Sequence, residues 1–378
     1  MKRSVDRILT THAGSLPRPA DLLATDPADP GHGARVRDAV ADVVRRQVAV
    51  GLDVVTDGEM SKPSFITYVT ERLSGLERSS EPGAVAWADS KEAAAFPEFY
   101  APTLRQSPNA AAPRFVCTGP ITYVGHARVQ ADIENLKTAL AGADVEEAFI
   151  PAIAPSNVEG RQRNAYYKTD EAYLFAIAEA MREEYRAIVD AGFLLQIDDP
   201  RLVTYYILNP TSTVAECRAW AEVRVEALNH ALRGIPRERV RFHTCYSINM
   251  GPRVHDMELK DVVDLILRVQ AGAYSFEAAN PRHEHEWRVW EDVTLPEGAV
   301  LIPGVITQST VLVEHPELVA ERIERFARVV GRENVVAGAD CGFASFAGST
   351  EIHPSVVWAK LAALTAGAGL ASRRLWSH

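Results

Sequence analysis

The chain has 378 residues, of which 47% are hydrophobic, and it carries a formal net charge of −10. This composition is typical of a soluble globular protein, and the acidic excess argues against nucleic acid or an anionic membrane as the main partner. The first residues, MKRSVDRILTTHAG, lack the apolar core of a signal peptide, and no uninterrupted apolar run is long enough to cross a bilayer. Four cysteines do not make a disulfide scaffold, so we expect a cytoplasmic protein.

An amphipathic helix, a glycine and a short apolar strand recur along the chain. The first helix is predicted in VRDAVADVVRRQVAVG, where valines at helical spacing form one apolar face and Gly51 suits the helix end. LDVVTDGE is the strand that follows. The same order leads through Gly192 into FLLQIDDP, and Gly234, Gly272 and Gly331 precede VRFHTCYS, AYSFEAAN and NVVAGADCG. A parallel sheet with helical crossovers requires this alternation.

Three further strands are predicted in ILTTHAGS, in RFVCTGPIT around Cys117 and in AVLIPGVIT, which brings the number to eight. Eight strand–helix units favour an α/β protein with one (β/α)8 TIM barrel over residues 1–378. A doubly wound sheet is the alternative, but no G-x-G-x-x-G turn supports a dinucleotide fold. We expect residues 74–113 and 127–167 to form loop excursions over the C-terminal mouth of the barrel.

Polar residues follow the predicted strands, and in a barrel these positions meet on the rim that carries catalytic groups. They are His12, Gly14, Ser15, Asp57, Glu59, Thr118, Asp198, Asp199, His243, Cys245, Glu277, Thr307, Gln308, Asp340 and Cys341.

Four of these residues form a candidate metal site. His243 and Cys245 are two apart on one strand and project to the same side, while Glu277 and Cys341 end other strands. One imidazole, two thiols and one carboxylate match the ligands of tetrahedral zinc. Buried cysteine can also serve as a small apolar residue, and we interpret Cys117 and Cys217 in that way.

The charge of such a site indicates its chemistry. Zinc with two thiolates and a carboxylate carries about −1, which makes it a poor Lewis acid for activating water. It can hold an added thiol as its thiolate, and departure of Glu277 on thiol binding would keep four ligands. Alkyl transfer to sulfur therefore fits this site better than hydrolysis.

The ordered motifs THAGSLPRP, DVVTDGE, TGPIT, QIDDP, HTCYS, SFEAAN, PGVI and GADCG resemble the C-terminal catalytic barrel of cobalamin-independent methionine synthase. They are also similar to the related epoxyalkane:coenzyme M transferases. The resemblance covers nearly the whole chain. It implies a barrel of the uroporphyrinogen decarboxylase/methionine synthase type, with zinc bound by His243, Cys245, Glu277 and Cys341.

The same resemblance implies a homocysteine-like thiol as the acceptor. The backbone at Gly14 and Ser15 would bind its carboxylate, and Glu59 and Asp198, the predicted catalytic acids, would receive its ammonium group. Two carboxylates beside a thiol site also suit a cationic amine on chemical grounds. The alternative is that the rim acids Asp57, Glu59, Asp198 and Asp199 only pair with Arg18, Lys62 or Arg201.

The donor side departs from methionine synthase. The family places a histidine in the loop after the seventh strand, but PGVITQST has none and His315 lies further on. The alkyl donor thus stays open between a methyl-folate, a corrinoid protein and an epoxide. Two alternatives to methyl transfer remain, namely epoxide opening by a coenzyme M thiolate and a non-catalytic zinc-binding accessory role. In NPRHEHEW, we expect His283, Glu284 and His285 to form a solvated helix start, and contacts with the metal ligands or the substrate are the alternative. The sequence leaves the oligomeric state open.

Overall fold

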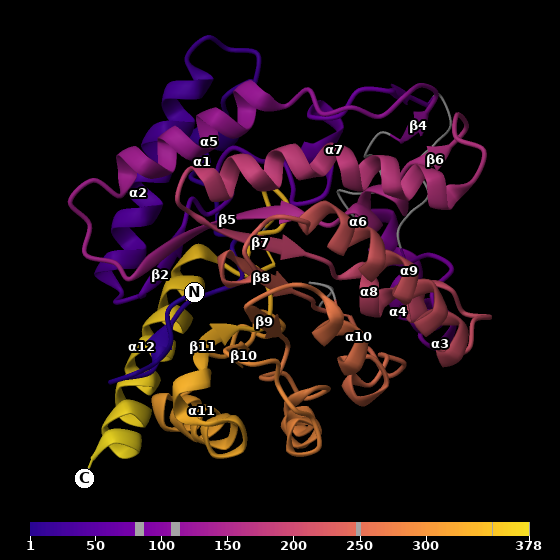
Figure 1. The fold of residues 1–378 in the computed structure, drawn as a ribbon. Helices are drawn as coiled ribbons and strands as arrows, with labels where there is room; N and C mark the ends of the chain where they lie inside the picture. The colour runs from indigo at the N-terminus through magenta and orange to yellow at the C-terminus, as the bar shows by residue number, and fades with distance from the viewer. Residues whose placement is uncertain (80–86, 107–113, 247–250, 350, 378) are drawn as a thin grey trace.

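Eight parallel strands form a nearly closed barrel with helices packed around it (Figure 1). This computed structural model describes residues 1–79, 87–106, 114–246, 251–349 and 351–377. The predicted TIM barrel is therefore confirmed. In chain order the barrel strands are β1 (Leu9–Thr10), β2 (Val54–Thr56), β5 (Glu147–Ile153), β7 (Leu194–Asp198), β8 (Val240–His243), β9 (Ala273–Phe276), β10 (Val300–Ile306) and β11 (Val336–Ala339).

Polar contacts between β1 and β2 bring the two ends of the sheet together. The backbone N–H of Asp53 donates to the carbonyl of Thr10 at 3.2 Å. The Asp53 carboxylate accepts from the backbone N–H of Thr10 at 2.7 Å and from the Thr10 hydroxyl at 2.8 Å. The Asp53 carboxylate thus links β1 to the start of β2, where the strands are too short to form a ladder of backbone hydrogen bonds.

The third barrel strand is not the predicted one. β5 pairs with β2 on one side and β7 on the other, so the barrel strand lies in FIPAI. The segment around Cys117 instead forms β4 (Phe115–Cys117) of a separate sheet, between β3 (Leu76–Arg78) and β6 (Arg163–Asn164). Pro151 lies inside β5, and proline is rare in central strands because it donates no ladder hydrogen bond. Residues 127–167 are therefore not simply a loop excursion.

The helices cover the outside of the barrel (Figure 1). Their bounds are α1 (Ala20–Leu23), α2 (His32–Ala49), α3 (Lys91–Ala95), α4 (Pro97–Gln106), α5 (His126–Ala139), α6 (Pro155–Glu159), α7 (Asp170–Asp190), α8 (Arg201–Leu208), α9 (Val214–Leu232), α10 (Val263–Arg268), α11 (Pro316–Val330) and α12 (Pro354–Trp376). Short 3-10 turns are η1 (Thr67–Glu71), η3 (Arg237–Arg239), η4 (Leu259–Asp261), η5 (Glu284–Glu291) and η6 (Arg332–Asn334).

Helix α2 has the apolar face that its sequence predicts. Val36, Val40, Val43 and Val44 are all buried, and Gly51 takes the left-handed conformation, with φ of +87°, just beyond the helix. A residue with a side chain is strained in that conformation, which explains the glycine between helix and strand.

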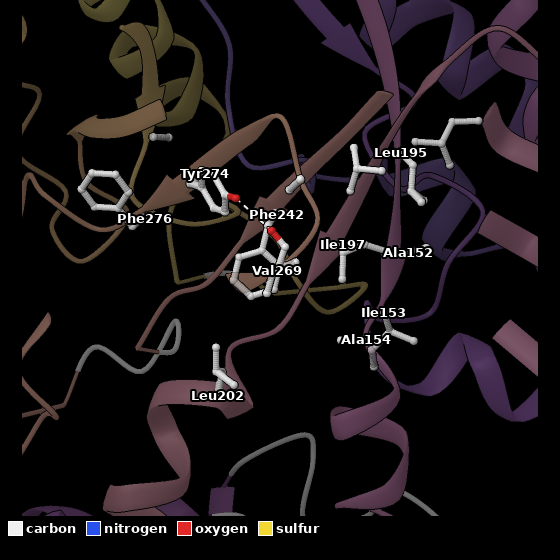
Figure 2. Packing of buried hydrophobic residues seen from close by; sticks show 14 of the residues in the cluster. Ala152, Ile153, Ala154, Leu195, Ile197, Leu202, Phe242, Val269, Tyr274 and Phe276 are labelled. Atoms are coloured by element: carbon white, nitrogen blue, oxygen red, sulfur yellow. Dashed lines mark hydrogen bonds between the residues drawn. The ribbon is translucent and has the colours of Figure 1, made fainter. Parts of the chain in front are cut away.

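The strands alternate between two apolar layers. Figure 2 shows Ala152, Ile197, Phe242 and Tyr274, from four neighbouring strands, in the layer that packs against the helices. Inside the barrel, smaller clusters pack against Met1 and consist of Leu9, Ala273, Val300, Ile302 and Val336, and of Val54, Phe149 and Leu194. The polar residues between them on the strands, such as Gln196, Asp198 and His243, are also buried. Side-chain alternation therefore directs them into the barrel.

Within the described ranges, α12 is the one helix long and apolar enough to cross a membrane by length and composition alone. It packs extensively against α11 and also contacts β1, β10 and β11. In Figure 1 it runs beside α11 along one side of the barrel. These contacts are those of a core helix.

Gly304 in β10 gives a test of the barrel's packing. A Cβ at this position would lie 2.0 Å from Oδ1 of Asp340 and 2.7 Å from its Cα, where the β10–β11 register shifts. Because backbone cannot move aside cheaply, we expect Gly304→Ala to lower the free energy of unfolding by about 1–3 kcal/mol. Urea unfolding measures it. The control is Gly33→Ala in α2, where nothing lies within 4 Å. An equal effect of both substitutions would contradict the packing argument.

Candidate metal centre and acceptor site

Strand register places the first site residues in one row. Asp198 of β7 pairs with His243 of β8, and His243 pairs with Ser275 of β9. Nδ1 of His243 lies 3.0 Å from the Ser275 hydroxyl, so one ring nitrogen is held by the neighbouring strand. The other nitrogen is then left to face a ligand, as in metal sites where a hydrogen bond orients the histidine.

His243, Cys245 and Cys341 converge at the C-terminal end of the barrel. Their potential ligand atoms all lie within 4.8 Å of one another, and all three residues are buried. The Sγ atoms of Cys245 and Cys341 are 3.1 Å apart. Tetrahedral zinc with Zn–S bonds of about 2.3 Å needs a wider sulfur separation, so binding requires only a small outward movement. The donor set, one nitrogen and two sulfurs, fits zinc.

In the absence of a metal, Cys341 holds its proton tightly. The hydrogen bond with Cys245, followed by burial, raises the pKa of Cys341 well above its usual range. Without a cation nearby, loss of both thiol protons is therefore unfavourable. A bound metal would stabilise the two thiolates. By contrast, Cys117 lies in the side sheet and Cys217 in α9, both buried, as their apolar interpretation predicted.

Glu277 lies beside this cluster but is not one of the three converging residues. Its Oε1 accepts from the backbone N–H of Tyr246 at 2.8 Å, and its Oε2 accepts from the Asn280 amide at 2.7 Å. The Arg253 guanidinium is 3.4 Å from Oε2. Burial raises the pKa of Glu277 to about 7. The carboxylate thus has partners of its own in this structure.

Glu59 is a buried carboxylate with incomplete pairing. Lys62 Nζ is 3.8 Å from it and Arg18 is 4.0 Å away, but neither donates a hydrogen bond to it. Arg18 bonds to the carbonyls of Glu59, Lys62 and Ala344 instead, and Lys62 bonds to that of Pro151. Among the residues described, Oε2 of Glu59 has no hydrogen-bond partner. Burial raises its pKa, as expected of a carboxylate that lacks full compensation.

Asp198 shares this corner with Glu59. Its Oδ1 accepts from the Gln196 amide at 2.7 Å, and burial raises its pKa to about 7. The charges of Glu59 and His243 also influence that pKa, so the three groups lie close together. Asp199, in contrast, accepts from Ser156, Asn157 and the backbone of Leu202 at the start of α8, which is a structural role.

The turn after β1 borders both groups of residues. The Gly14 N–H donates to Nδ1 of His12 at 3.2 Å, and burial lowers the pKa of His12 to about 4, so this imidazole is neutral. The carbonyl of Ser15 accepts from the N–H of Phe343, two residues beyond Cys341. A Cβ on Gly342 would lie 2.0 Å from the Ser15 hydroxyl. The predicted carboxylate-binding turn is therefore packed directly against the metal-site loop.

Two sequence expectations about the rim fail. Thr118 is exposed beside β4, where its N–H donates to the carbonyl of Gly75, so it is not a rim residue. His283 is not part of a solvated helix start but is buried and stacked on Tyr246 with ring centroids 3.9 Å apart. Arg253 and Asp256, which contact Glu277 and His283, were missed because no motif or periodicity marks them.

The barrel and its buried His/Cys/Cys cluster define a TIM-barrel protein with a candidate metal centre. Residues 156–363 match the family described as "Cobalamin-independent synthase, Catalytic domain". Since this match spans more than half of the chain, the protein belongs to that family.

Curated relatives and solved structures agree with this assignment. The chain is 25% identical to the methionine synthase of Thermococcus kodakarensis over 310 residues, 81% of this chain and 76% of the relative. It is 25% identical to that of Sulfolobus acidocaldarius over 359 residues, 90% and 87% of the two chains. The B12-independent methionine synthase from Shewanella sp. W3-18-1, in complex with selenomethionine, matches with a TM-score of 0.75 at 20% identity, covering 98% and 100%. At that identity the structure shows the shared fold.

The metal centre can be tested by removing one sulfur. We expect Cys341→Ser to lower the zinc content of purified protein sharply, because a serine hydroxyl is a poor zinc ligand compared with a thiolate. Metal analysis by mass spectrometry measures the zinc bound per chain. Cys217→Ser in α9 is the matched control and should retain zinc. Full zinc retention in Cys341→Ser would contradict the site.

The raised pKa of Asp198 predicts a pH dependence of stability. Because the folded-state pKa is about 7, against an ordinary value of 3.8, the folded protein binds the Asp198 proton more tightly than the unfolded chain does. This contribution is present below the ordinary pKa and is lost as pH rises towards 7. Relative to Asp198→Asn, the metal-free wild type should lose at most about 4 kcal/mol over this range. Urea unfolding at pH 5 and 7.5 tests this, and parallel pH profiles would contradict it.

Proposed function

We propose that this protein is a zinc-dependent enzyme that transfers an alkyl group, most simply methyl, to the sulfur of homocysteine or a similar amino-acid thiol. One observation carries the proposal. A buried cluster of His243, Cys245 and Cys341 lies beside two buried carboxylates: Glu59, whose Oε2 has no hydrogen-bond partner among the described residues, and Asp198, whose pKa is raised by burial. A ligand with both a thiol and an ammonium group would satisfy the two sites at once. The methionine synthases among the relatives support the same conclusion.

Each group then has a defined task. Zinc held by His243, Cys245, Cys341 and Glu277 would keep the acceptor as a nucleophilic thiolate at neutral pH. Glu59 and Asp198 would bind the ammonium group, and the turn at Gly14 and Ser15 would face the carboxylate. A new bond forms between sulfur and the alkyl carbon, while the bond to the donor breaks and its electron pair stays on the donor. The four cysteines are all free, which suits a reducing cytoplasm.

The acceptor corner favours an amino-acid thiol over coenzyme M. Coenzyme M carries a sulfonate and no ammonium group, so its recognition requires available cations. Arg18 and Lys62 are the nearby cations, and their hydrogen bonds go to backbone carbonyls. Among the described residues, the group in this corner that still lacks a hydrogen-bond partner is an acceptor, Oε2 of Glu59. The epoxide-opening reaction of coenzyme M transferases is therefore the second candidate.

The donor is the less defined partner. His315 lies at the start of α11, where its Nδ1 accepts from the backbone N–H of Glu317 at 3.2 Å. His315 therefore serves as a helix cap. The loop directly after β10, from Thr307 to Thr310, contains no histidine. Methyl-folate, a methylated corrinoid protein and an epoxide are the donors to compare.

The decisive experiment compares three thiols on the zinc-loaded protein: homocysteine, 4-mercaptobutanoate, which lacks the amine, and coenzyme M. X-ray absorption should show one additional sulfur ligand with homocysteine. Glu59→Gln should raise the Kd for homocysteine about tenfold or more, as expected for losing a charge-assisted hydrogen bond, and should leave that for 4-mercaptobutanoate unchanged. Mass spectrometry of thiols incubated with each donor then identifies the product.

The outcomes separate the candidates. If coenzyme M alone adds a sulfur ligand, the epoxide reaction replaces methyl transfer to homocysteine. If no thiol adds sulfur, the protein is a non-catalytic zinc-binding protein and the proposal is wrong.

A further inference from the structure

Glu277 has a complete binding position away from the cysteine pair. The backbone N–H of Tyr246, the amide of Asn280 and the guanidinium of Arg253 all approach its two oxygens, at 2.8, 2.7 and 3.4 Å. The Glu277 side chain is fully inaccessible to solvent. A buried carboxylate is stable only where donors or cations compensate its lost hydration. These three groups provide part of that compensation without a metal.

Arg253 is itself held in place by buried groups. It donates to the carbonyl of Tyr246 at 2.5 Å, and its Nε lies 3.8 Å from Oδ2 of Asp256. Asp256 in turn lies 3.3 Å from Nε2 of His283 and 3.5 Å from Nε of Arg282. The guanidinium side chain is only 5% exposed. These contacts hold the buried guanidinium of Arg253 beside Glu277.

We propose that Arg253 is a positioning residue that stabilises Glu277 in this off-metal position and so makes Glu277 the ligand that a thiol replaces. This inference rests on the proposed function, in which Glu277 completes the metal site. His243, Cys245 and Cys341 converge on one point, whereas Glu277 lies outside that group and its two oxygens accept from Tyr246 and Asn280. The position near Arg253 holds the displaced carboxylate and keeps its charge compensated while the thiol is bound.

The proposal predicts opposite effects on two affinities. Without the guanidinium, the displaced Glu277 carboxylate would be buried with only two donors, so it would compete more strongly for the metal. Thiol binding should weaken, while metal binding in the absence of thiol should stay the same or become tighter. General damage to the site would weaken both.

The experiment uses Arg253→Gln in the full-length protein, loaded with zinc or with Co²⁺ as a spectroscopic probe. Chelator competition measures metal affinity without thiol. Titration with homocysteine, followed by the Co²⁺ absorption bands, measures thiol affinity. We expect the thiol Kd to rise about tenfold or more, in line with the loss of a hydrogen bond to a charged group. Arg224→Gln is the matched control, because Arg224 also forms a partly buried ion pair, with Glu159 at 2.7 Å, elsewhere in the fold.

Each outcome decides. An unchanged thiol Kd in Arg253→Gln, or a parallel loss of metal and thiol affinity, overturns the role of Arg253. If Arg253→Gln does not fold, Arg253→Lys keeps the charge but not the planar fork, and it should raise the thiol Kd several-fold; no change in it overturns the proposal as well. If the wild-type protein adds no sulfur ligand at all, the proposed function fails instead.

Discussion

Parallel strand register is the constraint on which the rest of the site depends. Because all eight strands run in the same direction, each strand ends at the same rim, and neighbours in register present their last residues in one row. Asp198, His243 and Ser275 form such a row. Cys245 and Glu277 lie two residues beyond His243 and Ser275, and Cys341 follows β11. Chain direction thus gathers residues that are 143 positions apart in sequence, from Asp198 to Cys341.

The buried polar groups inside the barrel make this row rigid. Arg241 donates to the Thr11 hydroxyl at 3.0 Å and to the His12 carbonyl at 2.9 Å, and its guanidinium lies 3.9 Å from the ring centroid of Phe149. Gln196 bonds to both the Ala13 carbonyl and Asp198. These side chains tie the end of β1 to β7 and β8. The turn after β1, which includes Gly14 and Ser15, is therefore positioned by hydrogen bonds from side chains inside the barrel.

Strand periodicity explains how far the sequence could predict this arrangement. The strand-end positions of His243, Cys245, Glu277 and Cys341, together with the family resemblance, predicted one metal site, and the structure brings three of the four, His243, Cys245 and Cys341, together. Pro151 lies inside β5, and because proline is unusual in a central strand, the sequence favoured the segment around Cys117 as the third strand. Side-chain alternation gives no information about loops.

The surroundings of Glu277 are formed by such loops, so the sequence did not predict them. Arg253 and Asp256 lie in an irregular segment whose path is fixed by tertiary contacts, including a buried Glu92 carboxylate that accepts from the N–H groups of Val254 and His255. Glu92 is about 160 residues away in sequence. No local pattern could have predicted that contact, nor the burial of His283.

The backbone of Glu59 has a consequence for how this protein can evolve or be engineered. Glu59 is one of two non-glycine residues with positive φ among those described, at 59°, a conformation that costs most side chains free energy. The same residue buries a carboxylate with one unpaired oxygen. Replacing it with glycine or asparagine would relieve both strains. Engineering for thermal stability alone would therefore favour replacing Glu59, and such a change would remove the carboxylate that we propose receives the ammonium group of the acceptor.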